Sequence, residues 1–274
     1  MQRLSSEQKI KIEDFSKKGF SLNRISLEMN LGKTTIYYYT RKIHGKRQMP
    51  FEPPKDDENI GEFIGIFAGD GCYVEYDYYH ITKFYFSGDE KEYAESVKNL
   101  VSQMFNRTSC LSFDKTSKIW MLRFHSKDVG NFIKIYLVWK GRKTYSMKMK
   151  RLNHSRDYKI GFLRGYLDTD GFCDRNSRKV SMFGVSERMM KQINLTVKSL
   201  GFKTKYYKDA NRGGNRKPLY FVNLSGQEAM RFIRKIKPRN SKRIRKWAHQ
   251  DLKSHIKSHE TFDILGPKVP NLES

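Results

Sequence analysis

The sequence predicts an α+β fold of two pseudo-symmetric αββαββα repeats, preceded by a small all-α domain. A pattern of glycines and an aspartate recurs at an offset of about one hundred residues, which indicates an internal duplication. Similar alternating and amphipathic segments follow each copy, whereas the N-terminal segment shows only helical periodicity. We expect five regions: a first domain (1–45), a linker (46–58), repeat 1 (59–150), repeat 2 (151–247) and a basic, flexible C-terminal tail (248–274).

The first domain is expected to contain three short helices. Ser5 and Ser21 are suitable N-caps for the first two, and a tight turn at Gly32 precedes a third helix over 33–43. This arrangement is typical of the helix-turn-helix motif. The third helix would present polar and basic residues to a DNA major groove: Lys33, Thr34, Thr35, Tyr38 and Arg41. The alternative is an ordinary three-helix bundle with a basic surface. The prolines and absent periodicity of 46–58 indicate a linker.

The repeated segments read NIGEFIGIFAGDG (59–71) and KIGFLRGYLDTDG (159–171). Both are expected to be helices that end at a glycine. Glycine inside a helix costs roughly 1 kcal/mol relative to alanine, so a stripe of glycines indicates that two helix backbones approach closely. The stripe consists of Gly61 and Gly65 in the first copy, and of Gly161 and Gly165 in the second. Two helices that cross along it would bring Asp70 and Asp170 together.

Two carboxylates at helix C-termini repel one another and the partial negative charge of the helix ends. A divalent cation such as Mg²⁺ would offset this repulsion. The alternative is that each aspartate is a solvated helix terminus. The same residue in the same register of both copies favours the cation site.

Equivalent elements are expected after each motif. Repeat 1 is expected to contain strands over 72–79, 81–87, 108–113 and 119–125, with helices over 89–105 and 126–138. Repeat 2 is expected to contain strands over 172–176, 179–185, 203–208 and 219–224, with helices over 186–200 and 225–236.

The composition limits the classes of function. The 274 residues include 54 Lys and Arg against 29 Asp and Glu, a formal net charge of +25. A polyanion is the natural partner of such a chain, and nucleic acid is the commonest one. No apolar run approaches the roughly 20 residues that span a bilayer, and we find no signal peptide. Three cysteines without metal-type spacing suit a reducing interior, so we expect an intracellular protein.

At residues 63–71 (FIGIFAGDG) and 163–171 (LRGYLDTDG) the chain resembles the LAGLIDADG homing endonucleases. The first motif departs from the family pattern at Ala68 and Gly69, and the acidic eighth letter is present in both copies. The resemblance covers about residues 57–240. It implies a saddle-shaped DNA-binding surface and a monomer that reads a long asymmetric site in double-stranded DNA.

The resemblance also implies a mechanism. Asp70 and Asp170, with the backbone carbonyls of Gly69 and Thr169, would hold Mg²⁺ or another divalent cation such as Mn²⁺. Cleavage of both strands would leave 3′ overhangs. A basic residue near each scissile phosphate would stabilise developing charge, and Lys118 and Lys217 are the first candidates for this catalytic role. For either lysine the alternative is a phosphate contact or a solvated surface position.

Further DNA contacts are expected on the strands and on the basic stretches 140–151 and 231–246. The candidates are Arg123, Lys203, Lys205, Asn223, Arg239, Lys242 and Arg243. Arg123 is also the second candidate for the catalytic basic residue, although its counterpart Asn223 is neutral. In the C-terminal tail, His255 and His259 are spaced for a metal, but a frayed tail is the expected state.

Three other functions are consistent with parts of this pattern. A bacterial transcription-factor family joins a LAGLIDADG fold to a helix-turn-helix, but there the catalytic acids are typically degraded. Some LAGLIDADG proteins bind their host intron RNA as maturases, which the sequence leaves open. A fused intein is disfavoured, because we find no flanking splicing motifs.

Overall fold

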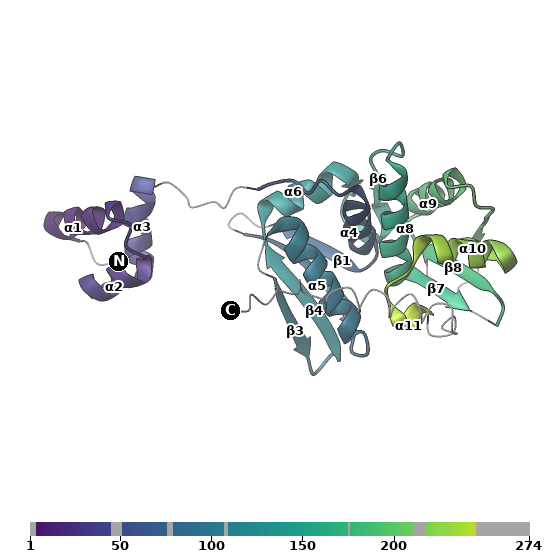
Figure 1. Cartoon of the computed structure of the whole chain (residues 1–274), viewed down its shortest axis with the longest axis horizontal. Coiled ribbons are helices and arrows are strands. Elements are labelled where there is room, and N and C mark those ends of the chain that lie inside the picture. Colours follow the sequence, from purple (N-terminus) through teal and green to yellow (C-terminus); the bar gives the residue numbers. More distant parts are fainter. Residues whose placement is uncertain are drawn as a thin grey trace, which may run out of the picture. The chain divides into compact units, whose positions relative to one another are not determined.

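The computed structural model describes residues 4–44, 51–75, 79–106, 109–174, 176–210 and 217–244. The chain divides into two compact units, 1–51 and 52–274, which are described separately (Figure 1). The predicted C-terminal tail, 248–274, and residues 46–50 of the predicted linker lie outside the described residues.

The first unit contains three helices: α1 (Ser6–Lys17), α2 (Leu22–Met29) and α3 (Lys33–His44). Ser5 caps α1 in a capping box with Gln8, and Ser21 accepts a hydrogen bond from the backbone N–H of Arg24 at the start of α2. Helices this short are marginal in isolation, so packing must stabilise them. The buried side chains that join the three are Leu4, Ile12, Ile25 and Ile36.

The second unit repeats one order of elements. Repeat 1 contains α4 (Asp57–Asp70), β1 (Gly71–Glu75), β2 (His80–Ser87), α5 (Lys91–Phe105), β3 (Cys110–Asp114), β4 (Ile119–His125) and α6 (Lys127–Tyr136). Repeat 2 contains α8 (Arg156–Asp170), β7 (Gly171–Asp174), β8 (Lys179–Gly184), α9 (Glu187–Ser199), β9 (Lys205–Asp209), β10 (Leu219–Ser225) and α10 (Gly226–Ile236). The predicted α+β class with two αββαββα repeats is confirmed. Helix α4 begins two residues inside the predicted linker, because the Asp56 carboxylate accepts the backbone N–H of Asn59 as an N-cap.

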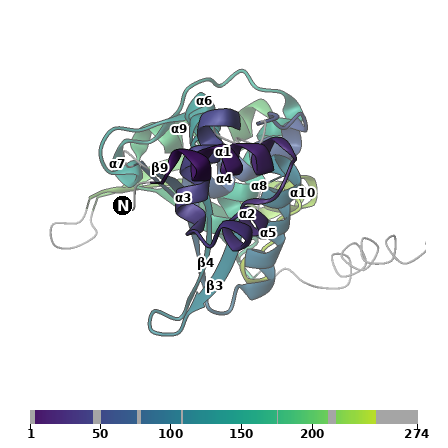
Figure 2. The ribbon, with the colours of Figure 1, turned by 90° about the vertical axis from the view of Figure 1, so that its left-hand side faces the viewer.

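Each repeat forms a four-stranded antiparallel sheet, and the two strand orders are equivalent. The orders are β1-β2-β4-β3 and β7-β8-β10-β9. The β3–β4 hairpin extends beyond the helices of its repeat (Figure 2). Side chains alternate along every strand, so one face of each sheet packs on helices and the other stays open.

Aromatic side chains dominate the core of repeat 1. Phe84 of β2 is fully buried and its ring contacts those of Phe63 and Phe67 from α4. In repeat 2 the strand residues Val180, Met182 and Val222 are equally buried. These residues place the helices on one face of each sheet and define which face is open. No helix among the described residues is long and apolar enough to cross a membrane.

Two short segments complete the second unit. Between the repeats, β5 (Leu137–Val138) pairs with β6 (Lys148–Met149), and the single-turn helix α7 (Lys143–Ser146) lies between these strands in the sequence. After α10, the chain continues into the single-turn helix α11 (Ser241–Ile244). Both segments supply a cation to the site described next.

Candidate active site at the ends of α4 and α8

Helices α4 and α8 pack backbone against backbone along their glycines. A Cβ atom at Gly61 would lie 2.0 Å from the carbonyl oxygen of Tyr158, and one at Gly161 would lie 1.9 Å from that of Glu58. Cβ atoms at Gly65 and Gly165 would each lie 2.2 Å from a carbonyl oxygen of the opposite helix. Only glycine leaves room for this approach. The contact fixes the two helices in register.

This register brings Asp70 and Asp170, the last residues of the two helices, to the same place. A Cβ atom at Gly69 would overlap the Thr169 side chain and lie 3.4 Å from Oδ2 of Asp170. Thr169 is itself buried and donates a hydrogen bond from Oγ1 to the carbonyl oxygen of Gly165. The four residues that the sequence predicts as metal ligands therefore lie together.

Asp70 and Asp170 are both half-buried. Burial, and then the negative charge of Asp170, raises the pKa of Asp70 to about 7. Burial also raises the pKa of Asp170, although Lys143 and Arg243 oppose this change. Within the part of the chain that the structure describes, neither carboxylate has a hydrogen bond or an ion pair. Charges withdrawn from water normally have partners, so a bound cation would stabilise this pair in its ionised form.

Lys143 caps the end of α4 and Arg243 caps the end of α8. In the sequence these two cations are as far apart as Asp70 and Asp170 are. The Nζ atom of Lys143, in α7, donates to the carbonyl oxygens of Phe67, Ala68 and Gly69 at 2.7, 3.0 and 3.0 Å. Lys143 is half-buried, and desolvation of its ammonium group lowers its pKa to about 8. In the second copy, Arg243 of α11 donates to the carbonyl oxygens of Asp168 and Thr169.

Sequence reasoning did not single out Lys143, although it lies within the predicted basic stretch 140–151. It included Arg243 only as a general DNA contact. The signal that could have found both is their separation, which equals that between Asp70 and Asp170.

The oxygen ligands around the two acids suit a hard divalent cation such as Mg²⁺. The described residues contain no group of three or more His, Cys, Asp or Glu side chains that could hold a metal. The carboxylates of Asp70 and Asp170 and the adjacent carbonyl oxygens of Gly69 and Thr169 are the oxygen atoms that could hold a cation here. The carbonyl of Gly69 accepts a hydrogen bond from Lys143, and that of Thr169 accepts one from Arg243. Each carbonyl oxygen retains a second lone pair.

Among the described residues, neither of the two lysines that the sequence favours as catalytic residues forms a hydrogen bond or an ion pair with Asp70 or Asp170. Lys118 is the last residue of the β3–β4 turn and lines an open pocket of about 570 Å³, whose described walls do not include Asp70 or Asp170. The Nζ atom of Lys217 lies 4.0 Å from the ring centroid of Tyr145, which is two residues after Lys143 in α7.

The predicted DNA contacts fall into two groups. Arg123, Lys205 and Asn223 lie on the open sheet faces, whereas Lys203 precedes β9 and donates its backbone N–H to Glu228. The cations near α11 contact repeat 1 instead. Lys242 forms an ion pair of 2.8 Å with Asp89, and Arg239 forms one of 3.1 Å with Glu62.

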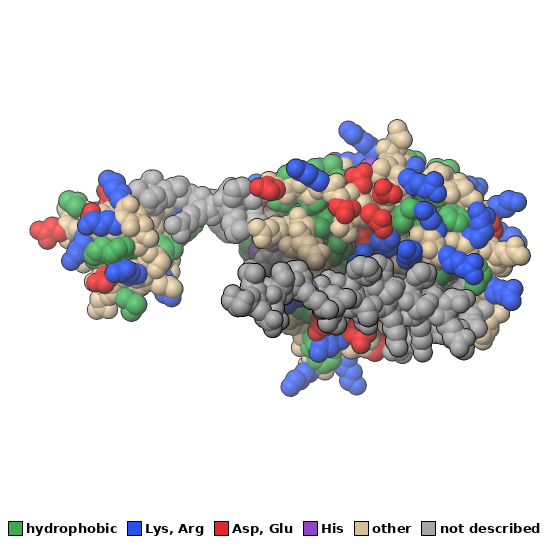
Figure 3. Space-filling view, viewed as in Figure 1, with side chains coloured by type: hydrophobic (Ala, Val, Ile, Leu, Met, Phe, Trp, Pro, Cys, Tyr) green, Lys and Arg blue, Asp and Glu red, His purple; other side chains and the backbone are tan. Residues whose placement is uncertain are grey.

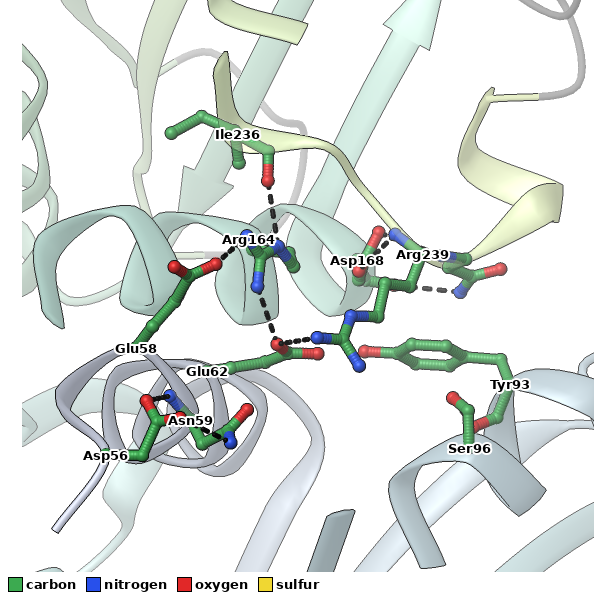
Figure 4. Close-up of polar contacts among 11 residues, drawn as sticks. Asp56, Glu58, Asn59, Glu62, Tyr93, Ser96, Arg164, Asp168, Ile236 and Arg239 are labelled. Atoms are coloured by element: carbon green, nitrogen blue, oxygen red, sulfur yellow. Dashed lines mark hydrogen bonds and ion pairs between the residues drawn. The ribbon is translucent and has the colours of Figure 1, made fainter. Parts of the chain in front are cut away.

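A buried polar network supports the α4–α8 pair on one side (Figure 4). Arg164 of α8 forms ion pairs with Glu58 and Glu62 of α4 and donates to the carbonyl oxygen of Ile236. Asp168 accepts the backbone N–H groups of Arg239 and Asn240, and burial raises its pKa to about 7 against these two bonds. The network ties the chain before α11, and with it Arg243, to both repeats.

Charge is unevenly distributed over the surface. One face shows acidic side chains gathered over α4 and α8, with Lys and Arg side chains around them toward α9 and α10 (Figure 3).

On α3 of the first unit, Lys33, Thr34, Tyr38 and Arg41 are exposed and Ile36 is fully buried. The polar side chains of α3 are therefore available to a partner.

Known proteins match this chain over parts of its length. Residues 157–237 match the family model of the LAGLIDADG-like domain, so the resemblance seen in the sequence is confirmed there. The ATP-dependent DNA helicase Hel308 of Thermococcus kodakarensis is 24% identical over 196 residues, which are 69% of this chain and 17% of the helicase. The chain thus spans less than a fifth of that relative's length.

Two solved structures are similar to the chain at low identity. I-DmoI in complex with DNA and Mn is 15% identical with a TM-score of 0.49, over 66% of this chain and 97% of that one. The N-terminal LAGLIDADG domain of DUF199/WhiA is 12% identical with a TM-score of 0.46, over 71% of this chain and 89% of that one.

Proposed function

We propose that this chain, whose residues 157–237 form a LAGLIDADG-like domain, is a site-specific endonuclease that cleaves both strands of DNA with a divalent metal. One observation carries the proposal. Asp70 and Asp170 are two half-buried carboxylates that have no hydrogen bond or ion pair among the described residues, in a chain with a formal net charge of +25. Carboxylates oppose the binding of phosphate, so their place in a basic protein is explained by a metal that joins them to phosphate.

Asp70 and Asp170 would hold Mg²⁺ or Mn²⁺, with help from the free lone pairs on the carbonyls of Gly69 and Thr169. A bound divalent metal supplies Lewis acidity to the phosphate and lowers the pKa of bound water. The protein supplies the position, because the glycine contact between α4 and α8 fixes where both acids lie.

Lys143 and Arg243 would stabilise the negative charge that develops on the phosphates during hydrolysis. Each contacts the carbonyl oxygen of the residue just before an acid. Their contacts favour them for this role over Lys118 and Lys217. The two copies carry different cations, so the two strands would be cut with different pH dependence.

The DNA would lie on the open faces of the two sheets, as a long asymmetric site read by a monomer. Hydrolysis of one bond in each strand would leave staggered ends with 3′ overhangs. The exposed polar side chains of α3 would add a second DNA contact in the manner of a helix-turn-helix.

The test is selection of cleaved duplexes from a randomised DNA library, with the full chain in Mg²⁺ at fixed salt. The combined variant Asp70→Asn/Asp170→Asn should not cut the selected site. It should bind that site in EDTA at least as tightly as the wild type, since two negative charges facing phosphate are removed. Asp157→Asn, at the other end of α8, is the matched control and should cut normally.

A direct metal measurement separates loss of metal from loss of fold. Mg²⁺ should raise the melting temperature of the wild type and of Asp157→Asn, but not that of the combined variant. A wild type that binds a defined DNA sequence and never cuts it would favour a regulator. Selective binding of structured RNA without DNA cleavage would favour a maturase.

A further inference from the structure

The open faces of the two sheets differ in chemistry at equivalent positions. The first cross-strand row after each acid starts two residues beyond Asp70 or Asp170. In repeat 1 the register places Cys72, Lys83, Arg123 and Cys110 in this row. In repeat 2 it places Phe172, Ser181, Asn223 and Lys205 in the equivalent row. Arg123 and Asn223 occupy the same place in the two copies.

Both side chains lie on the open faces. The neighbours of Arg123 in β4, Leu122 and Phe124, are buried against the helices, so Arg123 points the other way. The alternation Val222, Asn223 and Leu224 in β10 gives the same result for repeat 2.

Arg123 is a cation that has no hydrogen bond or ion pair with any other residue that the structure describes. It is exposed, and Lys83 lies directly opposite it on β2. The guanidinium fork therefore has all five N–H donors available, together with a neighbouring positive charge.

Asn223 is held in one orientation by its neighbours. Ser181 donates its hydroxyl to Oδ1 of Asn223, and Nδ2 of Asn223 donates to the hydroxyl of Tyr207 at 3.2 Å. The Tyr207 ring is in turn stacked on Phe221 at 4.8 Å between centroids. An amide has two acceptor lone pairs and two N–H groups, so one of each remains available for a base.

We propose that Arg123 selects guanine in one half of the DNA site and that Asn223 selects adenine at the equivalent position of the other half. An arginine fork pairs with the two acceptors of guanine, O6 and N7, whereas an amide pairs with N6 and N7 of adenine. The inference rests on the endonuclease function proposed above. It predicts that the two half-sites carry different bases at equivalent positions.

The test compares base preferences after selection of bound duplexes from a randomised library, with the full chain in EDTA at fixed salt. The wild-type consensus should contain a guanine in one half and an adenine at the same distance from the centre in the other. Arg123→Ala should lower the guanine preference at that position by about tenfold or more and leave the other half unchanged. Asn223→Ala should do the same for the adenine alone.

Two further variants separate base reading from other effects. Ser181→Ala keeps the Asn223 amide but removes one bond that orients it, so the adenine preference should fall while the guanine preference stays. Lys208→Ala removes an exposed cation of β9 outside the row and should leave every base preference unchanged.

The outcomes are distinguishable. If the wild type enriches no sequence, the proposed endonuclease function fails. If it enriches a consensus whose base preferences survive Arg123→Ala, or if the position that changes does not hold guanine, the inference about Arg123 is overturned. Because Arg123 is exposed and has no described partner, that variant should fold even if Asn223→Ala does not.

Discussion

Glu62 of α4 and Arg164 of α8 form an ion pair of 2.9 Å although only 2% and 5% of their side chains are exposed. Their counterparts in the other copy are Phe162 and Ile64, so the two sides of the helix pair have different chemistry. One side is charged, and the other stacks the rings of Tyr158, Phe162 and Tyr166. The contact between the two repeats is therefore asymmetric.

Removal of Arg164 should destabilise the fold strongly. Arg164→Met leaves Glu62 buried with Arg239 as its one ion-pair partner among the described residues, and breaking a buried pair from one side costs about 3–5 kcal/mol. The free energy of unfolding from urea titration measures this. Arg231→Met is the matched control, because its ion pair with Glu228 lies at the surface and is worth about 1 kcal/mol or less.

The double variant Glu62→Leu/Arg164→Met should recover much of that loss, since the opposite side of the same helix pair is already apolar. A double variant as unstable as Arg164→Met alone would show that the charges are needed for more than mutual neutralisation.

Neutralising Asp70 should stabilise the metal-free protein in a pH-dependent way. The folded-state pKa of about 7 exceeds the unfolded value of 3.8, so the folded state holds its proton to higher pH. The ionised carboxylate of Asp70 therefore destabilises the folded state. This destabilisation is complete above pH 7, decreases as the pH falls and vanishes below about 4. Asp70→Asn removes it, which adds up to about 4 kcal/mol at pH 8 and less at pH 5.

Urea titration in EDTA at these two pH values measures the increment. Asp157→Asn, which changes an exposed carboxylate on α8, should add nothing at either pH. An equal gain from Asp70→Asn at pH 5 and pH 8 would show that the carboxyl group is not destabilised by its charge.

Alanine at Gly61 should disrupt the helix pair. The added Cβ would lie 2.0 Å from a backbone oxygen of α8, which no change of rotamer can relieve. We expect a loss of about 3 kcal/mol or more, by thermal or urea unfolding. Gly32→Ala is the control, because its Cβ would lie 3.9 Å from its nearest neighbour, and it should be tolerated. A well-folded Gly61→Ala protein would contradict the backbone contact.

The glycine stripe and the duplication were sufficient to predict the repeats and the meeting of Asp70 and Asp170, because both features recur with one period. The reason for the glycine after each acid was not predictable. Gly71 has a φ of −79° and is no left-handed cap, but a Cβ atom there would lie 2.4 Å from the Phe67 ring. Such a reason depends on packing.

The cations of the site were harder to predict than the acids. Lys143 comes from a single-turn helix between the repeats, in a stretch rich in other cations, and only the folded chain shows which of them reaches α4. The pair of Glu62 and Arg164 was missed for the opposite reason. Each residue departs from the repeat, and a search for similarity discards such positions.

Lys143 should set the alkaline limit of cleavage if it stabilises charge on a phosphate. Burial lowers its pKa to about 8, so the ammonium is charged below that pH and loses its proton above it. The rate of cleavage at fixed Mg²⁺ should therefore fall above pH 8. Lys143→Arg, which keeps its charge, should fall less steeply between pH 8 and 10. Lys150→Arg, an exposed change nearby, should keep the wild-type profile, and an identical profile for Lys143→Arg would exclude this role.

The first unit should add affinity for DNA without adding chemistry. Lys33 and Arg41 of α3 are exposed, and each phosphate contact that is lost lowers the slope of log affinity against log salt by about 1. Lys33→Ala and Arg41→Ala should each weaken binding at low salt and flatten that slope, while single-turnover cleavage of saturated DNA stays at the wild-type rate. Lys17→Ala on α1 is the control, since this exposed cation pairs with Glu13 within its own helix and should leave the slope unchanged. A slower single-turnover rate in the α3 variants would mean that the first unit takes part in assembling the site around Asp70 and Asp170.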